Sequence, residues 1–222
     1  MSVTAHDVDI VVPAGRVDLP GTLTVPANPQ GVVIFAHGSG SSRKSSRNVA
    51  VARSLVNRSC AAFLFDLLSP QEAMDRRNVF NIELLAERMM RATEQIHHQD
   101  EVRSTPIGYF GASTGAAAAL VAAADLGDEI AAVVSRGGRP DLAGAALPRV
   151  TAPTLLLVGS LDSDVLELNR IAQRQMRCET SVIVIPGASH LFEESGTLEQ
   201  VAEHAGQWFA QAFASRATGS RS

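Results

Sequence analysis

The feature that most constrains the fold of this 222-residue chain is a series of short apolar runs in its central and C-terminal parts. Six runs occupy residues 31–36, 61–66, 106–111, 130–135, 154–159 and 181–186. Most of their residues are Val, Ile, Leu, Phe or Ala, so a strand formed by any of these runs would be apolar on both faces. Strands of this kind belong in a parallel sheet that helices cover on both sides.

Segments with helical spacing separate these runs. Apolar residues recur at intervals of three and four positions, as on one face of an amphipathic helix, in 49–56, 82–96, 165–172 and 198–212. Strands that alternate with helices make right-handed crossovers. We therefore predict an α/β fold in which a doubly wound, mostly parallel sheet carries helices on both faces.

The two ends of the chain give further expectations. Apolar and polar residues alternate over 8–12 and again over 19–25, which predicts an antiparallel hairpin at the N-terminus. The length suits one domain with a sizeable core, which we assign to residues 1–214. The polar stretch 215–222 is expected to be a disordered tail.

Charge and composition exclude several classes of partner. The net charge is −4, and the cationic residues occur in short mixed clusters rather than in a stripe that would neutralise nucleic-acid phosphates. No basic segment followed by a long apolar stretch opens the sequence, so neither a signal peptide nor a membrane anchor is expected. We expect a cytoplasmic protein with no nucleic-acid or membrane partner, and the sequence leaves its oligomeric state open.

Reactive side chains follow several of the predicted strands. Ser113 follows 106–111, Asp162 follows 154–159, and His190 follows 181–186. The carboxyl ends of parallel strands meet at one edge of a sheet, where ligands bind in folds of this class. These three residues can therefore be neighbours although they are far apart in the chain, and they occur in the order Ser, Asp, His.

The stretch YFGASTGAAAAL, which contains Ser113, has the form of a sharp turn from strand to helix. Such a turn raises a serine hydroxyl above the sheet and crowds the neighbouring backbone, and Gly111 and Gly115 would relieve that crowding. Ser113 would then lie at a helix N-terminus, whose free N–H groups favour developing negative charge. We interpret Ser113 as a candidate nucleophile.

A serine nucleophile needs a base, and histidine has a suitable pKa of about 6.5. His190 is the best placed of the six histidines, and Asp162 would hold its ring in the correct tautomer. Asp162 has an alternative role as a helix N-cap, because LDSDV precedes a helical pattern, and Asp164 is a second candidate for that cap.

Two further roles follow from residues near the strand ends. The backbone N–H groups of Thr114 and Ser39 are the predicted oxyanion donors, which leaves His37 with a structural role. Arg136 directly follows a predicted strand, so its guanidinium could pair with a substrate carboxylate. Alternatively, Arg136 pairs with Asp141 or caps backbone carbonyl groups.

Little of the sequence is free to form a lid. Residues 136–152 leave room for one short helix, and the other possible cover, 67–80, is polar through its middle. Its apolar residues are Leu67, Leu68, Met74, Val79 and Phe80. We therefore predict a minimal lid or none, and a preference for short acyl chains.

Several blocks of the sequence occur in a characteristic order, and among them are VVIFAHGSGSSRKSSRN, IGYFGASTGAAAAL, LLLVGSLDSDV and VIPGASHLFEE. In their residues and their order these blocks resemble the α/β-hydrolase superfamily, and within it the dienelactone-hydrolase-like group. The resemblance implies a hydrolase of small esters that acts through Ser113, Asp162 and His190, without a metal or organic cofactor. Dienelactone hydrolases proper have a cysteine nucleophile, so lactone specificity does not carry over. Some relatives are fused to a phosphoribosyltransferase domain, and no such domain is expected here.

The resemblance leaves other functions open. A thioesterase, amidase or acyltransferase would use the same residues on another substrate or acceptor. A non-catalytic binding protein with this fold would keep the pocket and lose the chemistry.

Overall fold

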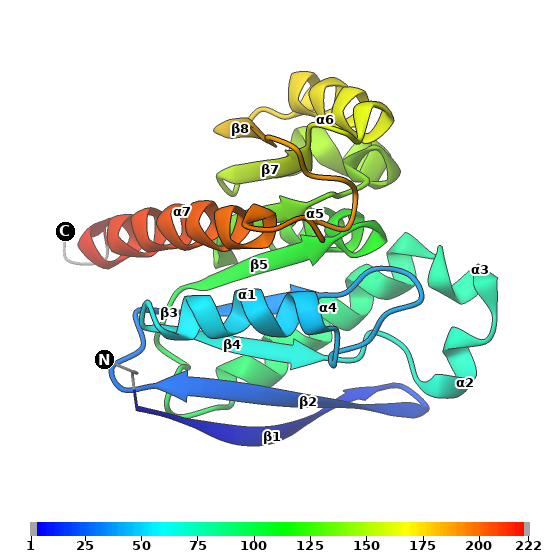
Figure 1. The fold of residues 1–222 in the computed structure, drawn as a ribbon. Coiled ribbons are helices and arrows are strands. Elements are labelled where there is room, and N and C mark those ends of the chain that lie inside the picture. Colours follow the sequence, from blue (N-terminus) through cyan, green and yellow to red (C-terminus); the bar gives the residue numbers. More distant parts are fainter. Residues whose placement is uncertain (1–3, 220–222) are drawn as a thin grey trace.

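The computed structural model describes residues 4–219, and within them eight strands form one sheet in the order β1-β2-β4-β3-β5-β6-β7-β8 (Figure 1). All six apolar runs are strands, each within one residue of its predicted bounds. The strands are β1 (Ala5–Ala14), β2 (Val17–Pro26), β3 (Gly31–Ala36), β4 (Cys60–Phe65), β5 (Ile107–Ala112), β6 (Ile130–Arg136), β7 (Thr154–Gly159) and β8 (Thr180–Ile185).

The direction of the strands confirms the predicted sheet. Neighbouring strands from β3 to β8 pair in parallel. The hairpin of β1 and β2 is antiparallel, and β2 joins the sheet by antiparallel pairing with β4. The parallel strands therefore end along one edge, and in Figure 1 the arrowheads of β4 and β5 point to the side where α2 and α3 lie.

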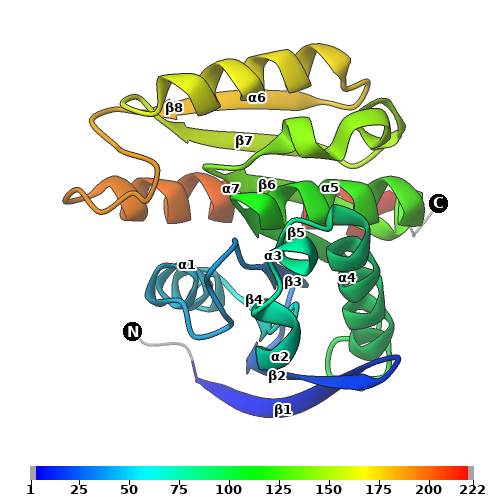
Figure 2. The same ribbon diagram turned by 90° about the vertical axis from the view of Figure 1, so that its right-hand side faces the viewer.

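Helices cover both faces of the sheet. On one face α1 packs against α7, and on the other α4 packs against α5 (Figure 2). The helices, with two segments of 3-10 helix marked η, are α1 (Ser46–Val56), α2 (Pro70–Ala73), α3 (Arg76–Val79), α4 (Ile82–His97), α5 (Thr114–Leu126), η1 (Gly127–Glu129), η2 (Pro140–Arg149), α6 (Ser163–Gln175) and α7 (Thr197–Gly219). The α/β fold with helices on both faces is confirmed.

Each face has its own apolar core, because the strands are apolar on both sides. One core lies between the sheet and α4, α5 and η2, and the other lies between the sheet and α1 and α7. In the second core the rings of Phe209 and Phe213 stack, with their centroids 5.7 Å apart. Phe213 lies directly over Gly31, and Phe209 lies over Gly108, so α7 approaches the strands where they lack side chains.

The C-terminal helix corrects one prediction. Residues 215–219 belong to α7 rather than to a disordered tail, and residues 220–222 lie outside the described part of the chain. The side chain of Arg216 donates a hydrogen bond to the Ile130 carbonyl at the start of β6, which ties the last turns of α7 to the sheet. Neither α7 nor any other helix in residues 4–219 has the length and apolar character needed to cross a membrane.

The packing of α7 gives a stability prediction. Phe213 is buried against the sheet, so Phe213→Ala should leave a cavity and lower the free energy of unfolding by about 3–5 kcal/mol. Urea unfolding of the purified proteins measures this loss. Phe80→Ala is the matched control, because the Phe80 side chain is half exposed and its removal should change stability little. Equal losses in the two variants would contradict the prediction.

Candidate active site

Ser113 lies at the turn between β5 and α5 in a strained backbone conformation, with φ of 51° and ψ of −123°. Non-glycine residues seldom adopt a positive φ, and such strain persists only where the surroundings enforce it. Here the Ser113 N–H donates to the Arg136 carbonyl over 3.3 Å, and the Ser113 carbonyl accepts from the Arg139 N–H over 3.1 Å. The end of β6 and the segment that follows it therefore hold the serine on both sides.

The two glycines of the turn have the predicted role. A Cβ added at Gly115 would lie 2.3 Å from the Ala36 carbonyl oxygen, and one added at Gly111 would lie 2.4 Å from the Ala116 Cα. Both distances are far too short for real atoms, so only glycine lets α5 start this close to β3 and β5. The close approach of α5 to β3 and β5 confirms the predicted sharp turn from strand to helix.

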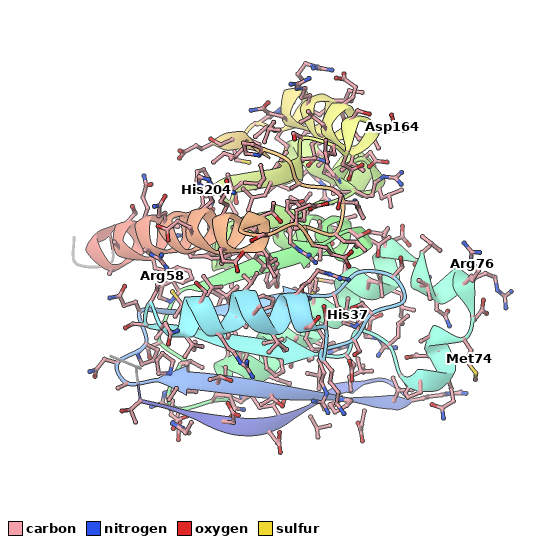
Figure 3. All side chains as sticks on the ribbon, in the orientation of Figure 1. His37, Arg58, Met74, Arg76, Asp164 and His204 are labelled. Atoms are coloured by element: carbon pink, nitrogen blue, oxygen red, sulfur yellow. The ribbon has the colours of Figure 1, made fainter. Side chains whose placement is uncertain are left out.

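His190 and Asp162 meet at the same edge of the sheet. The Nδ1 atom of His190 lies 2.6 Å from Oδ2 of Asp162, and the loops after β8 and β7 carry the two residues. Asp162 occupies the N-cap position of α6 without a side-chain hydrogen bond to the helix, which leaves its carboxylate to the histidine. Asp164 lies in the first turn of α6 and is exposed (Figure 3).

Ser113 and His190 both lie next to the end of β6. A Cβ added at Gly137 would lie 3.1 Å from the His190 carbonyl oxygen and 3.6 Å from its ring carbon Cε1, while the preceding residue, Arg136, accepts the Ser113 N–H. Within residues 4–219, however, no hydrogen bond joins Ser113 Oγ to the His190 ring. Catalytic hydrogen bonds are often long in ligand-free enzymes and shorten when substrate binds.

The two predicted oxyanion donors are neighbours. Thr114 is the first residue of α5, so its N–H has no acceptor within the helix. The N–H of Ser39 donates to the hydroxyl of Thr114, with 3.0 Å between the nitrogen and Oγ1. The Ser39 N–H therefore has an acceptor in this state, which sequence reasoning did not foresee.

His37 holds two loops together. Its Nε2 accepts a hydrogen bond from the Leu67 N–H over 3.0 Å, and its Nδ1 donates to the Gly38 carbonyl over 3.1 Å. Burial lowers the pKa of His37, so the neutral ring is favoured. Figure 3 labels this residue, which directly follows β3. Its hydrogen bonds fit the structural role that the sequence suggested.

A cavity of about 330 Å³ lies between the loop that follows β3 and the helices α2 and α3. Gly38, Ser39 and Thr114 belong to its lining. The rest of the wall is partly polar and partly apolar: Ser41, Ser42, Asp66, Leu67, Leu68, Pro70, Ala73, Val79 and Leu85 are among its residues. A larger hollow of about 490 Å³ lies between α1 and the β1–β2 hairpin and contains none of the predicted site residues.

Two short helices form the outer wall of this cavity. The carboxylate of Glu72 in α2 accepts a hydrogen bond over 3.1 Å from the buried Arg88 of α4, which fixes α2 to the body of the protein. Leu67, Leu68 and Val79 line the cavity as expected. Met74 and Phe80 do not, since Met74 is 80% exposed and Phe80 is 48% exposed. Figure 3 shows Met74 on the outside of α2.

Arg136 is buried at the end of β6, with 7% of its surface exposed. Its Nη2 donates to Asn48 Oδ1 over 3.3 Å, and the carboxylate of Asp141 instead pairs with Arg139. The predicted alternative of an Arg136–Asp141 pair is therefore wrong. Burial lowers the pKa of Arg136 to about 10, and the nearby charge of Arg47 contributes to this decrease.

The predicted absence of a metal stays a prediction. Among residues 4–219, no three or more His, Cys, Asp and Glu side chains are grouped so that they could hold a metal ion.

Comparison with known proteins identifies the family. Residues 29–217 match the family model of the alpha/beta hydrolase domain. The chain belongs to the α/β-hydrolase family. A crystal structure of a dienelactone hydrolase from Anabaena variabilis is 47% identical, has a TM-score of 0.89, and matches over 93% of this chain and 98% of its own. This likeness supports hydrolase activity and places the chain in the dienelactone-hydrolase-like group.

Two other proteins extend the comparison. A Mycobacterium tuberculosis protein named "Putative phosphoribosyl transferase Rv0571c" is 57% identical over 204 residues, which are 92% of this chain and 46% of that protein. The chain thus spans about half the length of this relative. The structure of Est1E from Butyrivibrio proteoclasticus is 17% identical with a TM-score of 0.79, covers 93% of this chain and 99% of its own, and shares the fold.

Replacement of His37 should remove a pH-dependent part of the stability. Because the pKa of His37 is lower in the folded protein than its ordinary value of 6.5, the unfolded chain binds this proton first as the pH falls. The contribution is therefore fully present above about pH 6.5 and is lost as the pH falls toward the folded pKa.

We expect His37→Gln to flatten the decrease of stability between about pH 6.5 and 5. Near pH 7.5 the variant should lose about 1–3 kcal/mol of unfolding free energy, since the Leu67 N–H no longer has a well-placed acceptor. Urea unfolding across this range measures both effects. The exposed His98 provides the control variant, His98→Gln. An equally steep decrease in His37→Gln would show that other groups cause it.

Proposed function

We propose that this protein is a serine hydrolase that cleaves small carboxylic esters through an acyl-enzyme intermediate, with Ser113 as nucleophile, His190 as base and Asp162 as the acid that orients it. The observation that supports this proposal most strongly is the 2.6 Å contact between His190 and Asp162 at the sheet edge where Ser113 is held at a positive φ. A histidine with a structural role, or an aspartate that only caps a helix, would not require a strained serine at the same sheet edge.

The acylation step assigns a role to each residue. Asp162 accepts the Nδ1–H of His190, which leaves Nε2 free to take the Ser113 proton as Oγ attacks the ester carbonyl. The tetrahedral intermediate carries its negative charge on the former carbonyl oxygen. The Thr114 N–H donates a hydrogen bond to this oxygen. The Ser39 N–H releases the Thr114 hydroxyl, to which it donates in the free protein, and donates to the oxyanion instead.

Acylation ends when His190, now protonated, gives its proton to the leaving alkoxide and the alcohol departs. In the second step a water molecule loses a proton to His190 and attacks the acyl carbonyl. Collapse of the second tetrahedral intermediate breaks the bond between Ser113 Oγ and the acyl carbon, returns the proton from His190 to Oγ and releases the acid. Both steps use the same donors, so one oxyanion site serves the whole cycle. No cofactor enters this scheme.

The cavity beside Ser39 and Thr114 suggests the size of the substrate. Its volume of about 330 Å³ is at the small end for ligand pockets, and its apolar wall is interrupted by Ser41, Ser42 and Asp66. A long acyl chain would find no continuous apolar surface there. We therefore propose that the enzyme prefers short acyl groups.

Other readings share parts of this site. A thioesterase, amidase or acyltransferase would use the same three residues, and a non-catalytic binding protein would use the cavity alone. The Mycobacterium tuberculosis relative has the name of a transferase, but this chain matches only 46% of that protein, so the name does not carry over to it. We favour hydrolysis over ligand binding because a strained serine and an oriented histidine serve catalysis and have no role in binding alone. Among the catalytic alternatives, the ester is the proposed substrate.

Substitutions at three residues test the assignment. Ser113→Ala should abolish hydrolysis of p-nitrophenyl acetate and labelling by a fluorophosphonate probe while the thermal unfolding temperature changes little. Asp162→Asn should lower kcat by about 10⁴, the loss that the same change causes in a serine protease.

The matched control is Asp164→Asn, two residues away in the first turn of α6, which should lose less than about tenfold because it affects only the helix end. Parent-level turnover in Ser113→Ala, or a larger loss in Asp164→Asn than in Asp162→Asn, would refute the proposed roles. No turnover in the parent protein would favour the binding-protein reading.

A second test concerns acyl-chain length. The limited apolar wall should make kcat/KM highest for acyl chains of about two to six carbons, because further methylenes do not gain their usual ~0.8 kcal/mol of burial. Measurements on p-nitrophenyl esters from acetate to palmitate, below their aggregation limits, give this profile. A steady rise toward palmitate would mean that α2 and α3 open to form an apolar channel.

A further inference from the structure

Asn169 is a buried polar residue of α6 that the proposed chemistry leaves unexplained. Within Ser163–Gln175 the buried residues are Asn169 and Ala172, and Asn169 is fully shielded from solvent. A buried amide is costly unless its polar atoms are hydrogen-bonded. An apolar side chain would serve better if this position only packed α6 against its neighbours, so the amide calls for a role beyond packing.

The amide nitrogen of Asn169 faces two backbone carbonyl groups. Nδ2 donates to the Gly138 carbonyl over 3.0 Å and to the Val165 carbonyl over 2.8 Å. Because both neighbours are acceptors, the amide lies with its nitrogen toward them, and a carboxylate in its place would be repelled by both. The bond to Val165 stays within α6, whereas the bond to Gly138 crosses to the segment after β6.

The peptide group between Gly138 and Arg139 links Asn169 to Ser113. Its carbonyl oxygen accepts from Asn169, and its N–H, on Arg139, donates to the Ser113 carbonyl over 3.1 Å. A hydrogen bond to the oxygen of a peptide group polarises that group and strengthens the bond that its N–H donates. Since a peptide group is planar, a partner that orients the oxygen also orients the N–H.

The segment that carries this peptide group has little stiffness of its own. Gly137 and Gly138 are consecutive, and glycine restricts the backbone dihedral angles least of all residues. Gly138 cannot be exchanged for a stiffer residue, because an added Cβ would collide with Ser135 Oγ and lie 2.6 Å from the Ala116 Cβ. The orientation of its carbonyl group therefore depends on a partner outside the segment, and Asn169 is such a partner.

We propose that Asn169 is a positioning residue for the hydrolysis: it fixes the peptide group between Gly138 and Arg139, which holds Ser113 in the conformation that presents its hydroxyl to the substrate. This inference rests on the proposed function. The same helix has Asp162 at its N-cap, about two turns before Asn169. Helix α6 thus supports two members of the proposed triad, one by carrying it and one through a peptide group.

Kinetics on a variant of similar side-chain volume test this role. Asn169→Leu removes the donor and should lower kcat for p-nitrophenyl acetate by about tenfold to a hundredfold, since a slightly misplaced nucleophile can lose that much rate. KM should change little, because Asn169 does not belong to the lining of the cavity beside Ser39 and Thr114.

The matched control is Gln173→Met. Gln173 lies one turn later in α6, and its amide donates to the Thr180 carbonyl of β8 over 2.9 Å. Its replacement removes a comparable hydrogen bond of the same helix without touching the segment that holds Ser113, so kcat should stay at the parent value. An unchanged kcat in Asn169→Leu, or equal losses in both variants, would overturn the proposal.

Asn169→Asp has nearly the same shape and covers the case in which Asn169→Leu does not fold. Burial raises the pKa of a carboxyl group, and a protonated carboxyl has an O–H that can donate to the Gly138 carbonyl. The ratio of kcat in this variant to kcat in the parent should therefore be well below one at about pH 9 and rise toward about pH 6 as the carboxyl takes up its proton. A ratio near one throughout this range would overturn the proposal.

Amide hydrogen exchange separates this inference from the proposed function. The Arg139 N–H should exchange about tenfold faster in Asn169→Leu than in the parent, because its peptide group has lost a partner. The Val133 N–H, which donates to the Pro153 carbonyl earlier in β6, should keep its rate. If the protein hydrolyses no ester and this pattern still appears, the proposed hydrolysis fails and the support of Ser113 by Asn169 stands. If kcat falls while the exchange of Arg139 is unchanged, the effect does not pass through this peptide group and the proposal is wrong.

Discussion

The close approach of α5 to β3 is the constraint on which the rest of the site depends. The backbone of Gly115 lies so near the Ala36 carbonyl that a Cβ would be 2.3 Å from its oxygen. This contact starts the helix directly above the sheet and forces Ser113 into its positive φ. It also places the Thr114 N–H beside the loop that follows β3, where the Ser39 N–H meets the Thr114 hydroxyl. A single backbone contact thus positions both the proposed nucleophile and the proposed oxyanion donors.

Much of this arrangement could be predicted from the sequence, because it depends on strand order and local geometry. Apolar runs on both faces identified the parallel strands, and parallel strands bring their carboxyl ends to one edge. The contact between His190 and Asp162 follows from that rule with no knowledge of side-chain detail. The two glycines around Ser113 could likewise be interpreted locally, since only a tight strand-to-helix turn requires both.

The predictions that were wrong concern side-chain contacts between segments. The spacing of apolar residues in the sequence does not show which segments make such contacts. Asp141 pairs with Arg139 two residues before it rather than with Arg136, because the buried side chain of Arg136 reaches Asn48 on α1. Met74 is apolar yet lies in solvent, since Glu72 and Arg88 fix α2 with its other side toward the cavity. Side-chain pairing of this kind has no period or spacing that a single sequence would reveal.

The same distinction explains why the partners of Arg136 were harder to predict than the contact between His190 and Asp162. Reactive groups must lie at strand ends, but a guanidinium is long enough to act far from its own backbone. Arg136 starts next to Ser113, whose N–H its carbonyl accepts, yet its charge lies under Phe192 and beside the first turn of α1. The proposed nucleophile and the loop that carries the proposed base therefore both contact one residue of β6. A movement of that loop would be felt at Arg136 and, through its carbonyl, at Ser113.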